Sequence, residues 1–203
     1  MSYNKAFITW NIIIIKKVLL GLTTLALVSS LSADIKPIIG IGIDEGGDDL
    51  AEARFFSGGS EKVKAGSGLV FEGGVAIKTP SVADKLETQL LVGYKMETID
   101  ADNGDIEMSR VYLNAIESYN FGKVSVGAGV TYHISPERSS SGIASNLGTT
   151  EFDSALGGVA QATFNFNQHS SIGVRATAIK YDVSNSNQSF DANAVGLYYL
   201  HAF

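Results

Sequence analysis

The sequence predicts an all-β protein, an eight-stranded antiparallel up-and-down transmembrane β-barrel. Three observations lead to this fold class: an N-terminal export leader, about eight segments in which apolar and polar residues alternate, and connections that are alternately long and short. The alternation gives every strand one apolar face, which in a membrane barrel contacts lipid. One domain is expected, because about 170 residues remain after the leader.

The leader comprises residues 1–33. Lys16 and Lys17 form its positive region, residues 18–28 its apolar region, and residues 29–33 a small-residue cleavage region. A single membrane-spanning helix would place both lysines near the bilayer centre, at a cost of roughly 2.5–3.5 kcal/mol each. We therefore expect a removed signal peptide with a long N-terminal extension, followed by a barrel of residues 34–203.

The predicted strands follow one another through the rest of the chain. They lie near 34–43, 67–78, 86–97, 107–119, 123–134, 151–166, 171–181 and 191–203. Segment 123–134 is the clearest, with apolar side chains at the even positions from Val124 to Tyr132. Segment 107–119 is the least regular: Arg110, Tyr112 and Ile116 do not all suit one lumen, which indicates a bulge there.

The connections distinguish a barrel from a soluble β-sandwich. The gaps at 44–66, 98–106, 135–150 and 182–190 are long and polar, whereas those at 79–85, 120–122 and 167–170 are short. A barrel with external loops at one rim and periplasmic turns at the other has this pattern. Aromatic residues collect at the two predicted rims, as in interfacial girdles. They are Tyr119, Phe121, Phe164, Phe166 and Phe203 at the short-turn end, and Tyr94, Tyr132, Phe152 and Tyr181 at the long-loop end.

Composition excludes several function classes. The chain has no cysteine and only three histidines, so a disulfide framework is excluded and no zinc site or other metal centre is expected. Its formal net charge of -6 is unsuited to a nucleic-acid partner. We expect no cofactor.

The C-terminal strand carries the most specific pattern. Val195, Leu197, Tyr199 and Phe203 occupy alternate positions up to a final phenylalanine, although His201 interrupts the series. In this the chain resembles the small eight-stranded outer-membrane barrels of the OmpA, OmpX and opacity-protein type. The resemblance implies a Gram-negative cell outer membrane, contact with its lipid and lipopolysaccharide, and recognition of Leu197, Tyr199 and Phe203 by the barrel assembly machinery.

The predicted lumen is narrow, because eight strands close so tightly that side chains fill the interior. Its candidate ion-pair residues are Glu72, Glu87, Lys95 and Arg175. Gln89, Lys36 and Glu117 are further candidates for the inward face. Buried charges of mixed sign must pair, which predicts a plug. The alternative is a gated solute path lined by the same charges.

The external loops offer two candidate cation sites. One follows the third strand and resembles the opening of a calcium loop without matching its order, and Asn-Gly there also favours a plain turn. It consists of Asp100, Asp102, Asn103, Gly104 and Asp105. The first loop is acidic and could bridge lipopolysaccharide through divalent ions. Its charged residues are Asp44, Glu45, Asp48, Asp49, Glu52 and Glu61, against Arg54, Lys62 and Lys64.

A third constellation has the residue types of acyl transfer. His133, Ser135 and either Glu137 or Glu151 could supply base, nucleophile and orienting carboxylate. The arrangement is similar to that of the outer-membrane lipid A deacylases. However, the alternation points His133 into the lumen, and Ser135 directly precedes Pro136 at the strand end. We therefore do not expect an enzyme.

The predicted function is structural or surface-interacting: a plugged outer-membrane barrel with four exposed loops. Loops 44–66 and 135–150 supply the longest surfaces, with a Ser- and Gly-rich tip at 139–142 suited to adaptable binding of a host or surface ligand. A narrow porin or small-molecule conduit is the alternative, and a lipid A deacylase the remote one.

Overall fold

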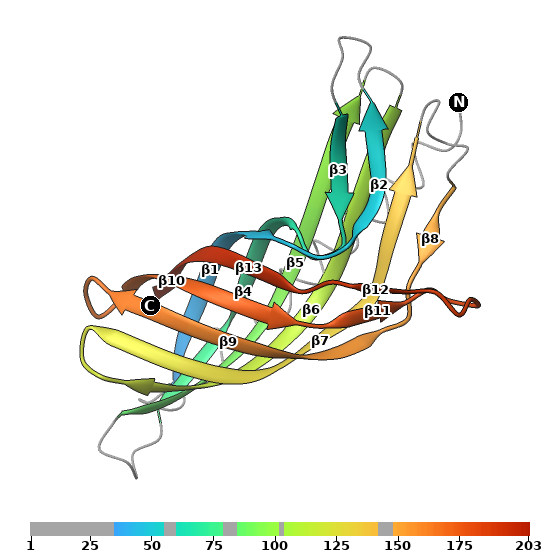
Figure 1. Cartoon of the computed structure of the whole chain (residues 1–203). Coiled ribbons are helices and arrows are strands. Elements are labelled where there is room, and N and C mark those ends of the chain that lie inside the picture. The colour runs from blue at the N-terminus through green and yellow to red at the C-terminus, as the bar shows by residue number, and fades with distance from the viewer. Residues whose placement is uncertain (1–34, 55–59, 79–84, 102–103, 142–147) are drawn as a thin grey trace.

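The computed structural model describes residues 35–54, 60–78, 85–101, 104–141 and 148–203, so the predicted signal peptide lies outside the described residues. The described elements are all strands, and eight of them form a closed barrel (Figure 1). They are β1 (Ile35–Glu45), β4 (Gly68–Lys78), β5 (Leu86–Ala101), β6 (Gly104–Asn120), β7 (Val124–Ser140), β9 (Ala155–Asn165), β10 (Ser170–Ala178) and β13 (Ala194–Ala202).

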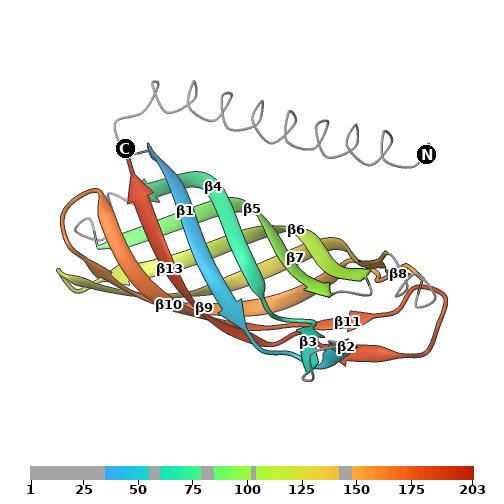
Figure 2. The same ribbon diagram turned by 90° about the horizontal axis from the view of Figure 1, so that it is seen from above.

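The barrel closes by pairing its last strand with its first. β13 is antiparallel to β1, from Ile38 opposite Ala202 to Glu45 opposite Val195, and Figure 2 shows the two strands side by side. Every other barrel strand pairs with its neighbours in chain order, and all these pairings are antiparallel. The predicted eight-stranded up-and-down barrel is thus confirmed.

The outer face of the barrel wall is apolar and exposed. Its large exposed side chains are Ile39, Ile41, Ile43, Leu69, Phe71, Leu90, Leu113, Val124, Val126, Val130, Tyr132, Ile134, Leu156, Phe164, Ile172, Val174, Val195, Leu197 and Tyr199. Many of the buried side chains between them are polar or charged, unlike those in the core of a soluble protein, because hydrocarbon rather than water covers the outside. Among the described residues, no helix is long and apolar enough to cross a membrane.

Three strands continue beyond the barrel wall. β5, β6 and β7 run to Ala101, Gly104 and Ser140, and form a sheet that projects past the barrel (Figure 1). We call this part the projecting sheet. Residues 98–101 and 104–106 are therefore strand and not the polar loop expected at 98–106, and β7 likewise includes Ser139 and Ser140 of the predicted flexible tip. Gly142 lies outside the described residues.

Two of the expected loops contain hairpins. β2 (Asp49–Arg54) pairs with β3 (Ser60–Lys64) inside the 44–66 gap, and β11 (Lys180–Asp182) pairs with β12 (Ser189–Asp191) around the 182–190 gap. The short strand β8 (Thr150–Glu151) adds to the edge of β7. Strands this short have too few residues to show an alternation of apolar and polar side chains in the sequence.

A bulge lies where β6 and β7 leave the barrel wall. Ser109 is opposite Glu137 while Val111 is opposite Ile134, so the extra residue belongs to β7, not to the segment 107–119 in which it was expected. Ser135 at this point has a φ of 39°, a left-handed conformation. The bulge preserves the alternation on both sides of it.

The expectation that β6 could not turn Arg110, Tyr112 and Ile116 to one lumen was wrong. All three are buried on the inner face. They suit one lumen because its interior changes along the barrel axis, with apolar layers next to polar ones. Glu117, expected to point inward, is instead exposed on the outer face, where it accepts a hydrogen bond from Thr88.

Candidate functional site

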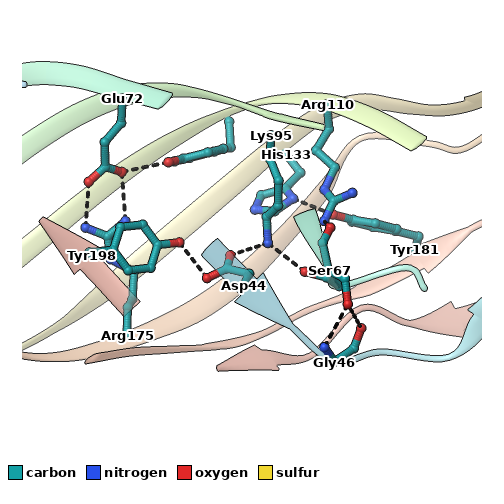
Figure 3. A network of polar contacts seen from close by, with 12 residues as sticks. Asp44, Gly46, Ser67, Glu72, Lys95, Arg110, His133, Arg175, Tyr181 and Tyr198 are labelled. Carbon is teal, nitrogen blue, oxygen red and sulfur yellow. Dashed lines mark hydrogen bonds and ion pairs between the residues drawn. The ribbon is translucent and has the colours of Figure 1, made fainter. Parts of the chain in front are cut away.

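A bidentate ion pair in the lumen joins Glu72 on β4 to Arg175 on β10. Arg175 Nη1 donates to Glu72 Oε2 at 2.7 Å and Nη2 donates to Oε1 at 2.9 Å (Figure 3). Tyr112 donates a third hydrogen bond to the same carboxylate, at 2.6 Å. A bidentate pair with its remaining lone pairs satisfied meets the conditions under which buried charges are tolerated.

Arg175 also starts a chain of amides that runs along the lumen. Its Nε and Nη2 donate to Gln161 Oε1, Gln161 Nε2 donates to Gln89 Oε1, and Gln89 Nε2 donates to Glu87 Oε1. Glu87 is half-buried at the far end of this chain. The structure therefore brings Glu72 and Arg175 together and connects Glu87 to them only through two glutamines.

A second ion pair in the lumen involves a residue that the sequence reading assigned to a loop. Lys95 on β5 pairs with Asp44, which is 4% exposed at the outer end of β1, and Tyr198 Oη donates to Asp44 Oδ1 at 2.8 Å. Asp44 could have been recognised, because the inward series Ile38, Gly40 and Gly42 of β1 continues to it.

Cations of the lumen also hold the segment between β3 and β4. Lys95 Nζ donates to the carbonyl oxygen of Gly66 at 2.8 Å, and Arg110 Nη2 donates to that of Ser67 at 2.7 Å. Gly46 N donates to Ser67 Oγ at 3.0 Å, which ties β1 to the same segment (Figure 3). Charges inside the barrel thus fix the chain that crosses its outer end.

Above these charges lies an apolar cluster, the outer cluster. Its buried members are Val63, Ala65, Ile99, Ile106, Met108, Phe152, Ile179, Tyr181 and Ala192. They come from both extra hairpins, from the projecting sheet and from the chain next to β8. Phe152 and Tyr181, expected in a lipid-facing girdle, belong to this cluster and are buried, because the hairpins fold over them.

The residues proposed for acyl transfer are not assembled. His133 is buried in the lumen, and its Nδ1 lies 2.5 Å from the hydroxyl of Tyr181. Ser135 is exposed at the bulge, and its backbone N donates to Ser154 Oγ. Glu137 and Glu151 lie opposite each other on β7 and β8, so this carboxylate pair is separate from the imidazole.

Carboxylates dominate the exposed surface of the outer end. Lys62, Lys64 and Lys180 each pair with a carboxylate, of Asp49, Glu45 and Asp191 respectively. The outward face of the projecting sheet carries further carboxylates, of Glu107, Glu137 and Glu151. Burial raises the pKa of Glu107, and the neighbouring Glu137 raises it further.

The structure does not assemble the two candidate cation sites in the part that it describes. Asp100 lies opposite Asp105 across the β5–β6 turn, and residues 102 and 103 are outside the described ranges. Within those ranges, no three carboxylates or histidines are grouped so as to hold a metal ion.

The C-terminal residues proposed as an assembly signal face outward. Leu197 and Tyr199 are exposed on the outer side of β13, and Phe203 is exposed at the chain end, against the ring of His201.

Comparisons with known proteins agree on the fold. No family model matches the sequence, and no curated protein does either. Among solved structures, Ail, the attachment invasion locus protein of Yersinia pestis, in complex with the heparin analogue sucrose octasulfate, matches with a TM-score of 0.50 and 11% identity. The match covers 84% of this chain and 98% of Ail. Neisserial surface protein A matches with a TM-score of 0.47 and 10% identity, over 83% of this chain and 97% of its own. The fold is therefore that of the small eight-stranded outer-membrane barrels.

Proposed function

We propose that this outer-membrane β-barrel is a closed surface protein, whose wall anchors it in the membrane and whose outer end engages an external partner. The observation that carries the proposal is the outer cluster, in which hairpins β2–β3 and β11–β12 pack against the projecting sheet. Nine buried side chains form a core outside the membrane part, which gives the outer end a defined shape. Loops that only kept the outer end of the barrel soluble would not need a buried apolar core.

The lumen supports the closed state. The Glu72–Arg175 pair crosses the barrel interior from β4 to β10, and Ile38, Ala76, Leu91 and Leu200 form a second apolar cluster nearer the periplasmic end. Charges that already satisfy one another do not offer a free path for ions. This favours the plug over the narrow-pore alternative.

Planar-bilayer recording of the refolded protein tests the closed state. We expect no steady single-channel current from the wild type. The double variant Glu72→Ala, Arg175→Ala removes the ion pair without leaving an unpaired charge, and a current found only in this variant would show that the pair contributes to closure. A steady current from the wild type would establish the narrow conduit instead.

The charge of the outer end indicates the chemistry of the partner. Its lysines are occupied in ion pairs, whereas Asp105, Glu107, Glu137 and Glu151 add negative charge to the projecting sheet. Such a field attracts cationic ligands and repels anionic ones. Although Ail was solved with a sulfated sugar, we propose a basic protein or peptide as the partner of this chain.

Binding to proteoliposomes tests the partner class. Fluorescent oligolysine and fluorescent heparin are offered to the same preparation at low and high salt. We expect oligolysine to bind and to be released by salt, since screening weakens surface electrostatics. Binding of heparin in place of oligolysine would contradict the proposal.

A further inference from the structure

A cavity opens at the end of the barrel where the short turns lie, which is the periplasmic end of an outer-membrane barrel. It encloses about 370 Å³, near the lower limit of the usual range for ligand sites. Residues of β1, β5, β7, β9, β10 and β13 line it, together with residues of the turns before β7 and β10. We call this cavity the periplasmic mouth.

The periplasmic mouth is closed toward the inside of the barrel. Ile38 and Leu200 line its inner end and belong to the second apolar cluster of the lumen. Leu200 and Glu72 lie side by side, because both would contact a Cβ atom on Gly40. Glu72 in turn pairs with Arg175 across the lumen. A molecule that enters from the periplasm therefore meets apolar side chains and a complete ion pair, so the cavity is suited to binding and not to passage.

The walls of the periplasmic mouth both donate and accept hydrogen bonds. Gln89 is 7% exposed and Thr163 is 8% exposed, so each lines the cavity from a fixed position inside the barrel. Gln89 Nε2 donates to Glu87 Oε1 at 2.9 Å. Asn165 Nδ2 donates to Ser125 Oγ at 3.0 Å. Each amide nitrogen carries a second N–H, and Glu87 has a second carboxylate oxygen, so a matching ligand supplies acceptors as well as a donor.

Positive charge predominates around the periplasmic mouth. Lys123 lines the cavity, and Lys36 and Lys78 continue the inward series of β1 and β4 to the same rim. Among the described residues, Glu87 is the one carboxylate that lines the cavity, and the ion pairs do not include any of the three lysines. Three cations around one carboxylate attract a ligand of net negative charge. The two ends of the barrel therefore favour ligands of opposite charge.

The hydrogen-bonding groups and the charge together select a short acidic peptide. Inorganic phosphate offers mainly acceptors, and a sugar acid has one negative charge and no ammonium group. A peptide backbone offers both N–H and C=O groups to the side-chain amides and hydroxyls. We propose that the periplasmic mouth binds a peptide of a few residues with acidic side chains. Its amino group lies at Glu87, and its carboxylates lie at Lys36, Lys78 and Lys123.

Isothermal titration calorimetry of the refolded protein in a neutral maltoside detergent tests this proposal. The probe is the tripeptide Ala-Glu-Asp, and Ala-Gln-Asn is the matched peptide without acidic side chains. Glucuronate and inorganic phosphate represent anions that are not peptides. We expect Ala-Glu-Asp to bind at one site and to bind more weakly at high salt. The other three ligands should bind at least about tenfold more weakly, because each lacks either the charge or the peptide groups.

Acidic peptides of this size occur both in the cell wall and at the ends of proteins. The γ-linked tripeptide Ala-Glu-diaminopimelate represents the cell wall, and Ala-Glu-Asp represents a protein end. A preference for one of them identifies the source, and both share the chemistry that the proposal requires.

Two lysine variants test the position of the site. Lys123→Gln removes a lysine that lines the cavity, and Lys85→Gln is the matched control. Lys85 lies at the same end of the barrel, but its Nζ lies over the ring of Tyr119, 6.0 Å from the centroid, and it does not line the cavity. Lys123→Gln should weaken binding about fivefold, the upper end for an exposed charge contact. Lys85→Gln should leave it unchanged. Ser171→Phe fills the cavity and should abolish binding, with heat-dependent gel mobility as the check that it folds.

Several results would overturn the proposal. They are no binding of either acidic peptide, equally tight binding of Ala-Gln-Asn, glucuronate or phosphate, and equal losses in Lys123→Gln and Lys85→Gln. Undiminished binding by folded Ser171→Phe would do the same, and the lysine pair decides if that variant does not fold. The oligolysine assay reports on the outer end and the bilayer recording on the lumen, so neither result bears on this site.

Discussion

The guanidinium of Arg175 lies 4.0 Å from the centre of the Tyr198 ring. The hydroxyl of the same tyrosine donates to Asp44, so Tyr198 contacts one member of each lumen ion pair. A cation over an aromatic face is attracted by the ring quadrupole, most strongly where water is excluded. The two ion pairs therefore form one connected network rather than two isolated contacts.

Replacing Arg175 by methionine should destabilise the barrel strongly. Arg175→Met leaves the Glu72 carboxylate buried without its cation, which typically costs about 3–5 kcal/mol. The double variant Glu72→Gln, Arg175→Met should recover most of this loss. Denaturant unfolding in detergent, followed by circular dichroism, measures both. Equal losses in the single and double variants would show that packing, and not the unpaired charge, sets the cost.

Removing Tyr181 should loosen the outer end while the barrel wall persists. Tyr181→Ala empties the centre of the outer cluster, and large-to-small changes of this kind cost about 3–5 kcal/mol. We expect faster proteolysis of the hairpins with retained heat-dependent gel mobility. Phe71→Ala, on the lipid-facing side, is the control and should leave the cleavage rate unchanged. Cleavage at the same rate in both variants would argue against a packed outer core.

The stability of variants at Ser135 should depend on how readily the new residue adopts a left-handed backbone conformation, and not on side-chain contacts. Ser135 has a φ of 39°, and a left-handed conformation costs a residue other than glycine roughly 1–2 kcal/mol. Ser135→Gly should therefore keep or raise the unfolding temperature, and Ser135→Val should lower it. Thermal unfolding of both variants is the measurement, and a loss of stability in Ser135→Gly would be the contrary result.

The acidic face of the projecting sheet should make stability depend on pH. The pKa of Glu107 is raised in the folded protein by burial and by Glu137, so the folded state holds this proton more tightly than the unfolded state. Stability should then fall as pH rises from the unfolded pKa through the folded pKa. Because the group is half-exposed, we expect an effect below about 1 kcal/mol. Glu107→Gln should stabilise the protein at pH 8 but not at pH 4, and a gain equal at both would remove the electrostatic explanation.

The position of His133 leads to a negative expectation for catalysis. Its imidazole contacts the Tyr181 hydroxyl inside the lumen, and Ser135 lies beyond the bulge. His133→Ala should leave the acylation of lipid A unchanged when lipid A is extracted from expressing cells and analysed by mass spectrometry. A shift in acyl number that depends on His133 would restore the deacylase hypothesis.

The barrel strands were predictable because lipid and lumen impose opposite demands on successive residues. The expected segment 67–78 and the observed β4 differ by one residue. The expected segment 123–134 matches β7 as far as the bulge, and β7 continues beyond the bulge to Ser140. The alternation of apolar and polar residues also assigns Leu197 to the lipid-facing side and its two chain neighbours to the lumen side, without any knowledge of contacts. It carries no information about which inward charges meet, since that depends on strands distant in sequence.

The outer end was less predictable for a physical reason. The buried Val63 lies within a mainly polar strand of five residues, and Tyr181 lies in one of three residues. Neither strand is long enough for a period to be read, and their burial follows from contacts between separate hairpins. Asp44 is the opposite case: extending the even-numbered series of β1 by one position would have placed it in the lumen.

The composition of the outer cluster has a consequence for biogenesis. Its members range from Val63 near the start of the barrel to Ala192 just before the final strand. A folding intermediate that lacks the last hairpin exposes the apolar side chains of the rest of the outer cluster to water. The apolar core of the outer end is therefore complete only when both hairpins, β2–β3 and β11–β12, are in place.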